Sequence, residues 1–486
     1  MAGLMLQGTG SDVGKSVLVA GLCRAAANRG LSVLPFKPQN MSNNAAVTAD
    51  GGEIGRAQAL QALGARAELH TDMNPVLLKP QADHTSQLVV HGKVRGTLGA
   101  ANFRECRRNL LPEVLESWKR LQSRCDIVIV EGAGSPAEIN LREGDIANMG
   151  FARAAGVPVV LIGDIDRGGV IASLVGTRTV IDPDDAAMIH GFIVNKFRGD
   201  PALFEDGYTA IEDLSGWRGF GVVPWLPCIA KLPSEDAVVL ERPQRAAAAR
   251  KLIACPMLPR ISNFDDLDPL RQEPNVELVM VPPGRPIPTE ANLIVIPGSK
   301  ATIADMAFLR TQGWDIDILA HHRRGGMVLG ICGGYQMLGQ TIADPLGIEG
   351  TPTEVAGLGL LAVTTELTAH KALRNIAGKA FGAAFEGYEM HMGTTAGPDT
   401  MRPFAMLDGN RADGAISKDK RVVGTYCHGL LSRPELRGKL LRRIGAQSDS
   451  ADHRMTVDAA LDDLANALEK HLDIDDLLAL AQGAGR

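Results

Sequence analysis

The sequence of 486 residues is poor in aromatic residues and has no excess of positive charge. Only 12 Phe, 4 Trp and 4 Tyr are present, so no aromatic stacking platform for a flat ligand stands out. The formal net charge of −6 excludes the basic field that nucleic-acid-binding proteins present to phosphates. No apolar stretch approaches the roughly 18 residues that a membrane-spanning helix needs. We therefore expect neither a nucleic-acid nor a membrane partner.

Cysteine is scarce too. The seven cysteines are odd in number, scattered and without C-x-x-C spacing, which argues against a disulfide framework or a zinc site. The N-terminus lacks the basic flank and the cleavage site of a signal peptide. Both observations favour a reducing, cytoplasmic location. The chain is long enough for two or three domains.

Short apolar runs and helical patterns alternate in two blocks of the sequence. In the first block we expect buried strands at 3–6, 32–36, 126–130, 158–162 and 188–194 and helices at 17–28 and 103–122. In the second block we expect strands at 251–254, 276–281, 293–296, 327–331 and 422–426. Alternation of this kind predicts α/β domains whose parallel sheets are covered on both faces.

A stretch at 236–250, rich in charge and alanine and without strand character, separates the two blocks. The predicted division is therefore a domain at 1–240, a second at 250–440 and a helical extension at 441–486. In the extension, apolar residues at Val457, Leu461, Leu464, Leu468 and Leu472 alternate with acids. This spacing predicts an amphipathic helix, which we expect to pack on the second domain.

The segment GTGSDVGKS, directly after the first expected strand, is a variant P-loop. Thr9 occupies the position of the first glycine of G-x-x-x-x-G-K-[ST]. The remaining parts are present: backbone amides around Gly10 and Gly14 can cradle phosphates, Lys15 can reach the β and γ oxygens, and the Ser16 hydroxyl can bind Mg²⁺. A glycine-rich turn without function is the alternative. The preceding strand and following helix favour an ATP site.

Three further strand ends carry polar residues that can serve this site. Glu131 ends a hydrophobic strand and suits a second Mg²⁺ ligand, although it can instead cap the next turn. Lys37 can stabilise a γ-phosphate or an acyl phosphate, or be an ordinary surface lysine. The acids Asp164 and Asp166 can bind metal or acceptor, or cap the glycines that follow them.

The segment MVLGICGG predicts a cysteine nucleophile at Cys332. An apolar strand at 327–331 enters a Gly-x-Cys-x-Gly turn, and a helix can start just after it. Such a turn strains the backbone at the nucleophile, and its glycines are needed where a Cβ would clash. The nearby helix N-terminus favours the thiolate.

A thiol nucleophile also needs a base and an oxyanion hole. The predicted base is His428, flanked by Gly429 at the end of a strand, with His391 as the rival. The backbone amides of Gly333 and Gly298 are the expected oxyanion donors. A thiolate and an ATP site in one chain suggest glutamine hydrolysis coupled to ATP-driven amide formation.

Several specific segments together resemble the cobyric acid synthase family, nearly end to end and in the same order. They are GTGSDVGKS, FKPQNMSNN, GRAQALQA, EGAGSPAEIN, DIDRGGV, RISNFDDLDPL, IPGSKAT, GICGGYQMLG, GYEMHMG and GTYCHGLL. The resemblance implies a P-loop synthetase domain similar to dethiobiotin synthetase, joined to a class I-type glutamine amidotransferase domain. It implies ATP- and glutamine-dependent amidation of the b, d, e and g carboxylates of adenosylcobyrinic acid a,c-diamide, with Cys332 as nucleophile and His428 as its histidine.

One position departs from the wider class I glutaminases. Those enzymes usually carry Glu two residues after the histidine, where this sequence has Leu430. Glu435 is the nearest acid, but it is out of register. Either a backbone carbonyl or a distant acid then orients His428.

Two other functions remain open at this point. The protein can be the related a,c-diamide synthase, or another ATP-dependent amidotransferase with a different acceptor. It can also be a P-loop regulatory ATPase with an inert glutaminase-like domain, although the presence of both Cys332 and His428 argues against that.

Overall fold

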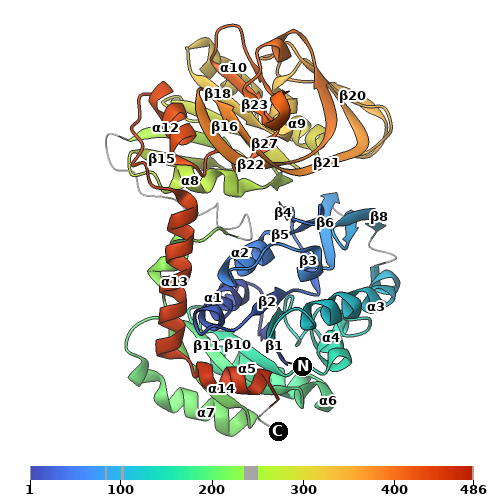
Figure 1. Ribbon diagram of the computed structural model, residues 1–486, viewed down its shortest axis with the longest axis vertical. Helices are drawn as coiled ribbons and strands as arrows, with labels where there is room; N and C mark the ends of the chain where they lie inside the picture. The colour runs from blue at the N-terminus through green and yellow to red at the C-terminus, as the bar shows by residue number, and fades with distance from the viewer. Residues whose placement is uncertain (1, 83–84, 100–102, 235–249, 484–486) are drawn as a thin grey trace.

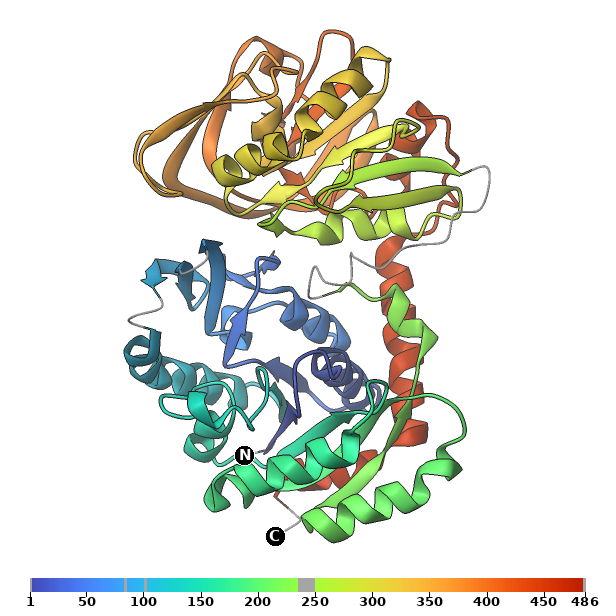
Figure 2. The ribbon, with the colours of Figure 1, turned by 180° about the vertical axis from the view of Figure 1, so that it is seen from behind.

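The computed structural model describes residues 2–82, 85–99, 103–234 and 250–483. The chain forms two lobes stacked along the long axis. The helix α13 (His453–His471) runs along one side of the N-terminal lobe and reaches up to the C-terminal lobe (Figures 1 and 2). Within the described ranges, no helix is long and apolar enough to cross a membrane. The expected linker at 236–250 lies, apart from its last residue, outside the described residues.

The N-terminal lobe is built on a parallel sheet of six strands in the order β12-β11-β10-β1-β9-β2. The strands are β1 (Ala2–Gly8), β2 (Val33–Phe36), β9 (Ile127–Glu131), β10 (Val159–Asp164), β11 (Ile189–Phe197) and β12 (Arg218–Pro224). One face packs on α1 (Lys15–Asn28), and the other packs on α3 (Phe103–Gln122) and α4 (Met149–Ala155). Burial of both faces explains why these strands are continuous apolar runs.

The C-terminal lobe contains a second sheet, in the order β15-β13-β16-β18-β26-β25, which is parallel except at the β25 edge. The strands are β13 (Lys251–Pro256), β15 (Val276–Val281), β16 (Leu293–Ile296), β18 (Met327–Ile331), β25 (Ala415–Ile416) and β26 (Val422–Thr425). The predicted α/β class is confirmed. The boundaries at 240, 250 and 440 stay predictions.

Two mixed, mainly antiparallel sheets, which the sequence did not predict, bring the lobes together. The C-terminal lobe, the upper lobe in Figure 1, contributes β21 (Thr364–Ala380), β22 (Ala383–Ala396) and β27 (Cys427–His428). The N-terminal lobe, the lower lobe in Figure 1, contributes β3 (Gln39–Met41), β6 (Val76–Ala82), β7 (Thr85–Val90) and β8 (Lys93–Gly99), on its side facing the upper lobe (Figure 2). A small apolar cluster joins the lobes: Ala45, Val47, Leu77 and Val89 from below, Tyr388 and Met390 from above.

The C-terminal helices pack on the first lobe, so the expectation that they cover the second domain is wrong. Leu464 and Leu468 of α13 fill a notch at Gly21 of α1, where an added Cβ would come within 2.5 Å of Leu468. The buried Arg24 of α1 pairs with Asp458 at 2.5 Å and with Asp462 at 3.0 Å. The amphipathic pattern fixed which face is buried, but not which lobe supplies the partner surface.

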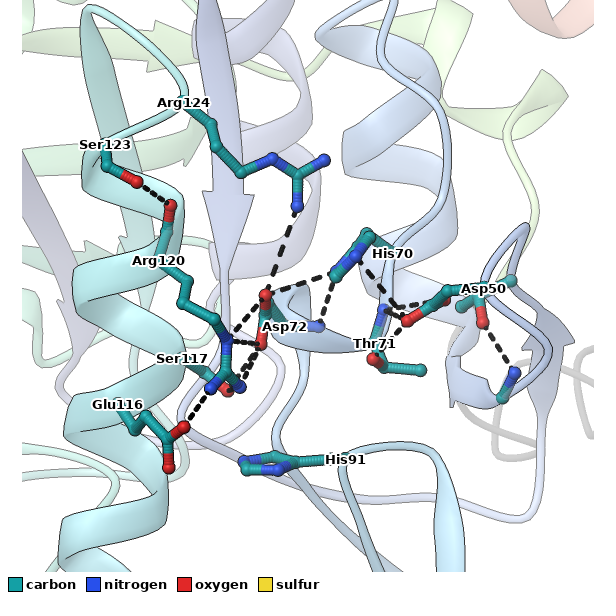
Figure 3. A network of polar contacts seen from close by, with 12 residues as sticks. Asp50, His70, Thr71, Asp72, His91, Glu116, Ser117, Arg120, Ser123 and Arg124 are labelled. Atoms are coloured by element: carbon teal, nitrogen blue, oxygen red, sulfur yellow. Dashed lines mark hydrogen bonds and ion pairs between the residues drawn. The ribbon is translucent and has the colours of Figure 1, made fainter.

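A buried carboxylate anchors the chain between the first sheet and α3 (Figure 3). Asp72, in the short 3₁₀ helix η1 (Thr71–Met73), accepts hydrogen bonds from Ser117 Oγ at 2.8 Å and from Arg120 Nε at 2.9 Å, both on α3. Thr71 Oγ1 donates to Asp50 at 2.5 Å. This network fixes the segment that leads into β6, and thus the position of the sheet that meets the upper lobe.

Candidate active sites

The turn around Cys332 has the strained geometry that its sequence predicts. Cys332 lies between β18 and α11 (Gly333–Leu338) with φ 53° and ψ −109°, a region that residues with a Cβ avoid. A Cβ on Gly334 would lie 2.1 Å from the carbonyl oxygen of Ile296, and one on Gly330 would lie 2.6 Å from that of Gly334. Only glycine fits at both positions, and the strained turn projects the thiol at the sheet edge.

His428 is fully buried and is oriented by Asp266. Nδ1 of His428 lies 2.7 Å from Oδ2 of Asp266, and the amide of Gly429 donates to Oδ1 at 2.6 Å. Burial alone would lower the pKa of His428, but the Asp266 carboxylate and then the Cys332 side chain raise it to about 10. A carboxylate on Nδ1 leaves Nε2 to face the reacting group.

Sequence reasoning missed Asp266, and Glu435 is exposed on α12 (Pro434–Arg443), where it plays no such part. Asp266 belongs to η7 (Phe264–Leu267), in the segment RISNFDDLDPL that carries part of the family resemblance. The sequence did offer a signal for Asp266. The histidine strand supplies no orienting acid, and this segment contains a run of acids that could supply one.

Of the two glycines expected to form the oxyanion hole, Gly298 lies next to His428, and Gly333 lies next to Ser299, the residue after Gly298. A Cβ on Gly298, in β17 (Gly298–Ser299), would lie 3.3 Å from Cε1 of His428. A Cβ on Gly333 would lie 2.9 Å from the amide nitrogen of Ser299. The rival His391 stacks on Tyr426 at 3.7 Å, and burial lowers its pKa to about 4.

Both lobes line a small cavity of about 60 Å³ at Cys332. Lys79 comes from the lower lobe, and Lys300 and Lys371 come from the upper lobe. Desolvation, followed by the charges of Lys79 and Lys371, lowers the pKa of Lys300 to about 7. The buried Glu53 accepts a hydrogen bond from Lys79 at 2.8 Å and also pairs with Lys371. The thiol therefore faces a lysine-rich pocket.

The P-loop turns from β1 into α1 through Gly14, whose φ is 98°. Lys15 Nζ donates to the carbonyl of Gly10 at 2.9 Å and to that of Gly134 at 3.0 Å, so it bridges two loops at the carboxyl edge of the sheet. The amide of Thr9 donates to Ile162 at 2.9 Å. Phosphate contacts from Thr9 would therefore come from its hydroxyl.

Glu131 lies next to Ser16, as an Mg²⁺ site requires. Ser16 Oγ donates to Oε1 of Glu131 at 2.7 Å, and Lys37 Nζ donates to the same oxygen at 2.9 Å. Lys37 is buried, so it is not a surface lysine. The described residues contain no cluster of three His, Cys, Asp or Glu side chains for a metal. The hydroxyl and carboxylate fit Mg²⁺, which usually takes one or two protein oxygens and completes its shell with phosphates and water.

A cavity of about 1330 Å³ opens from the P-loop toward the upper lobe. Its lining includes Arg107 and Arg142 from the lower lobe and Arg271 from the upper lobe. Asp164 and Asp166 also line it, with Asp164 paired to Lys196 at 2.7 Å and Asp166 to Arg198 at 2.6 Å.

Comparison with known proteins matches both lobes. Residues 4–239 match the CobQ/CobB/MinD/ParA nucleotide binding domain, and residues 252–436 match the CobB/CobQ-like glutamine amidotransferase domain. The chain is 71% identical over 485 residues to the cobyric acid synthase of Rhizorhabdus wittichii, covering all of both chains. It is 72% identical over 477 residues to that of Novosphingobium aromaticivorans (98% and 97% covered) and 58% identical over 480 residues to that of Brucella suis (98% and 99% covered).

These matches agree with the pairing of a thiol site and a P-loop site in one chain, and they confirm the resemblance that the sequence motifs carry. The chain belongs to the cobyric acid synthase family.

Proposed function

We propose that the protein amidates the b, d, e and g carboxylates of adenosylcobyrinic acid a,c-diamide, with glutamine as nitrogen donor and ATP as energy source. Its family makes it a glutamine-dependent, amide-forming ligase of cobalamin biosynthesis. The observation that carries the proposal is the Cys332–His428–Asp266 arrangement in one lobe, together with the P-loop of the other lobe at a cavity that both lobes line. The cytoplasmic location and the absence of nucleic-acid and membrane partners stay predictions.

In the glutaminase half, the sulfur of Cys332 attacks the side-chain carbonyl carbon of glutamine. The amides of Gly298 and Gly333 stabilise the oxyanion, and His428 gives its proton to the leaving nitrogen, which departs as ammonia. Water then attacks the thioester, His428 takes a proton from that water, and glutamate leaves. The lysines of the small cavity suit the α-carboxylate of glutamine.

In the synthetase half, a corrin carboxylate attacks the γ-phosphorus of ATP, and ADP leaves. The phosphates rest on the amides around Gly10 and Gly14, with Thr9, Lys15 and Lys37 as further donors. Mg²⁺, held by Ser16 and Glu131, would supply charge neutralisation. Ammonia then attacks the acyl carbon of the acyl phosphate, inorganic phosphate leaves, and the amide loses its extra proton.

The large cavity suits the acceptor in size and charge. A volume of about 1330 Å³ exceeds the roughly 300–1,000 Å³ of ordinary ligand pockets. Arg107, Arg142 and Arg271 line its walls, each paired with an aspartate of this chain. Their guanidinium groups are suited to bind the carboxylates of a polyacid as well.

The test is amidation of adenosylcobyrinic acid a,c-diamide by Cys332→Ala, with ATP and either glutamine or ammonium. The variant should fail with glutamine and work with ammonium, because only ammonia production needs the thiol. Cys228→Ala, a half-buried cysteine outside both sites, is the matched control and should use both nitrogen sources.

If the wild-type protein ignores this acceptor with either nitrogen source, the substrate assignment is wrong. Amidation of cobyrinic acid at its a and c carboxylates instead would identify the related a,c-diamide synthase activity. A regulatory ATPase with an inert glutaminase-like domain would release no glutamate.

A further inference from the structure

The short helix α2 (Arg56–Gly64) contacts both candidate sites. Toward its C-terminal end, Gln61 Nε2 donates to Oε2 of Glu131 at 2.5 Å and to the carbonyl of Ser16 at 3.3 Å. One turn earlier, Gln58 Nε2 lies 3.4 Å from the same carboxylate oxygen. Both glutamine side chains are buried. The helix is therefore attached to the carboxylate and the loop that we assign to Mg²⁺ and ATP.

The first residue of the same helix, Arg56, reaches the upper lobe. Its Nη2 lies 2.9 Å from Oδ2 of Asp265 and donates to the hydroxyl of Tyr388 at 2.6 Å. A third contact, at 3.1 Å to the carbonyl of Ala45, holds the guanidinium against its own lobe. Burial lowers the pKa of Arg56, but Asp265, Tyr388 and Asp266 together raise it above its ordinary value, so the group stays charged.

The two upper-lobe partners of Arg56, Tyr388 and Asp265, are both linked to His428. The ring of Tyr388 stacks on the imidazole with a centroid distance of 5.1 Å and an interplanar angle of 17°. Tyr388 also pairs with His428 across β22 and β27. Asp265 is the sequence neighbour of Asp266, the residue that binds Nδ1. Arg56 thus contacts both the stacking partner of the imidazole and the residue beside its acid.

The charges explain why an arginine is needed here. Burial and the neighbouring Asp266 charge raise the pKa of Asp265, and Arg56 opposes both. Without a cation, two adjacent buried carboxylates would repel each other, and one would take up a proton or turn away. Arg56 neutralises Asp265 and leaves Asp266 free to hold His428.

We propose that Arg56, supplied by the ATP-binding lobe, is a positioning residue for His428, and that α2 thereby makes glutamine hydrolysis depend on the state of the ATP site. The inference rests on the proposed function. Binding of MgATP gives Glu131 and Ser16 new partners, so Gln58 and Gln61 must readjust. A two-turn helix transmits that shift to Arg56 as a rigid unit.

The test is the rate of glutamate release by Arg56→Gln in the full-length protein, with and without ATP and the corrin acceptor. We expect kcat for glutamine hydrolysis to fall by up to about 100-fold, the loss that a misplaced catalytic group can cause. Arg56 is absent from the lining of the Cys332 cavity, so the KM for glutamine should change by less than about 3-fold. The stimulation of hydrolysis by ATP and acceptor should fall to about one.

Conservative variants separate positioning from general destabilisation. Arg56→Lys keeps the positive charge but lacks the planar guanidinium with its several donors, so it should recover part of the loss in kcat. Tyr388→Phe keeps the stacked ring but removes the hydroxyl, and its effect should largely disappear in the Arg56→Gln background. Arg66→Gln, at an exposed arginine just beyond α2, is the matched control and should behave as wild type.

Each outcome decides the matter. Glutamate release by Arg56→Gln at the control rate, or wild-type release that ATP and acceptor do not change, overturns the inference alone. If Arg56→Gln releases glutamate normally but loses amide formed per glutamate, Arg56 serves the large cavity, which it also lines, or only joins the lobes, and the inference is again wrong. If the wild-type protein releases no glutamate, the proposed function fails and the inference fails with it.

Discussion

Asp266 accepts the hydrogen bond from Nδ1 of His428 at 2.7 Å although 162 positions separate the two residues. The position two residues after the histidine, where wider glutaminases carry an acid, is Leu430, which is buried and packs in the core. The orienting acid of this lobe therefore comes from a loop near its start rather than from the histidine strand.

Asp266→Asn should lower kcat for glutamine hydrolysis by at least about 100-fold and move the pH profile. The carboxylate raises the pKa of His428 to about 10 against the effect of burial, so its removal lets this pKa fall. His428 must carry a proton to release ammonia. The alkaline limb of kcat should therefore move to lower pH in the variant, as steady-state glutaminase assays between pH 6 and 10 would reveal. An alkaline limb at the wild-type pH would contradict this role.

The same pair makes stability depend on pH. A folded-state pKa of about 10, above the unfolded value of roughly 6.5, means that the folded protein binds this proton more tightly. That contribution is complete below about pH 6.5 and is lost as pH rises through 10. The difference in Tm between wild type and Asp266→Asn should be largest near pH 6 and shrink toward pH 10. A difference that grows with pH would exclude a protonated His428.

Gly334→Ala should destabilise the upper lobe by several kcal/mol, on the order of 3–5, because the new methyl group would collide with backbone that cannot move aside. The added Cβ would lie 2.1 Å from the carbonyl oxygen of Ile296. Gly176→Ala, in α5 (Val170–Val180), is the control, since nothing lies within 4 Å of its Cβ. Thermal unfolding should show a lower Tm for the first variant and an equal or higher Tm for the second. Equal Tm values for Gly334→Ala and Gly176→Ala would mean that the turn at Gly334 has room for a methyl group.

Leu464→Ala should cost about 2–5 kcal/mol, the usual range for a buried leucine. The residue is fully buried between α13 and α1. Hydrogen exchange should then show lost protection in α1 rather than in α12, because α13 packs on the N-terminal lobe. Met455→Ala, at a side chain 72% exposed, should change neither quantity. Loss of protection confined to α12 would mean that α13 packs on the second domain, as the sequence predicted.

The sequence predicted what local patterns determine. Apolar runs located the central strands, and the glycines around Cys332 and Gly14 located both turns, because each turn requires residues without a Cβ within a few positions. What failed depends on contacts between distant segments. Asp266 is one of several acids in its loop, and only the folded loop shows which one reaches His428. Arg56 lies within a quoted motif, yet nothing local says that its partners belong to the other lobe.

Lys15→Met should lose amidation but keep glutamine hydrolysis, the reverse of what we expect for Cys332→Ala. Lys15 Nζ is held between the carbonyls of Gly10 and Gly134, at the point where the P-loop receives phosphates. Without its charge, amidation with glutamine and with ammonium should both fall by at least about 100-fold, which corresponds to about 2.7 kcal/mol of transition-state stabilisation. Glutamate release measured without ATP should persist, because the thiol and its histidine lie in the other lobe. Lys93→Met, at an exposed lysine of β8, should keep all three activities. Ammonium-dependent amidation that survives in Lys15→Met would mean that the acceptor is activated elsewhere, and the P-loop would then have lost its assigned role.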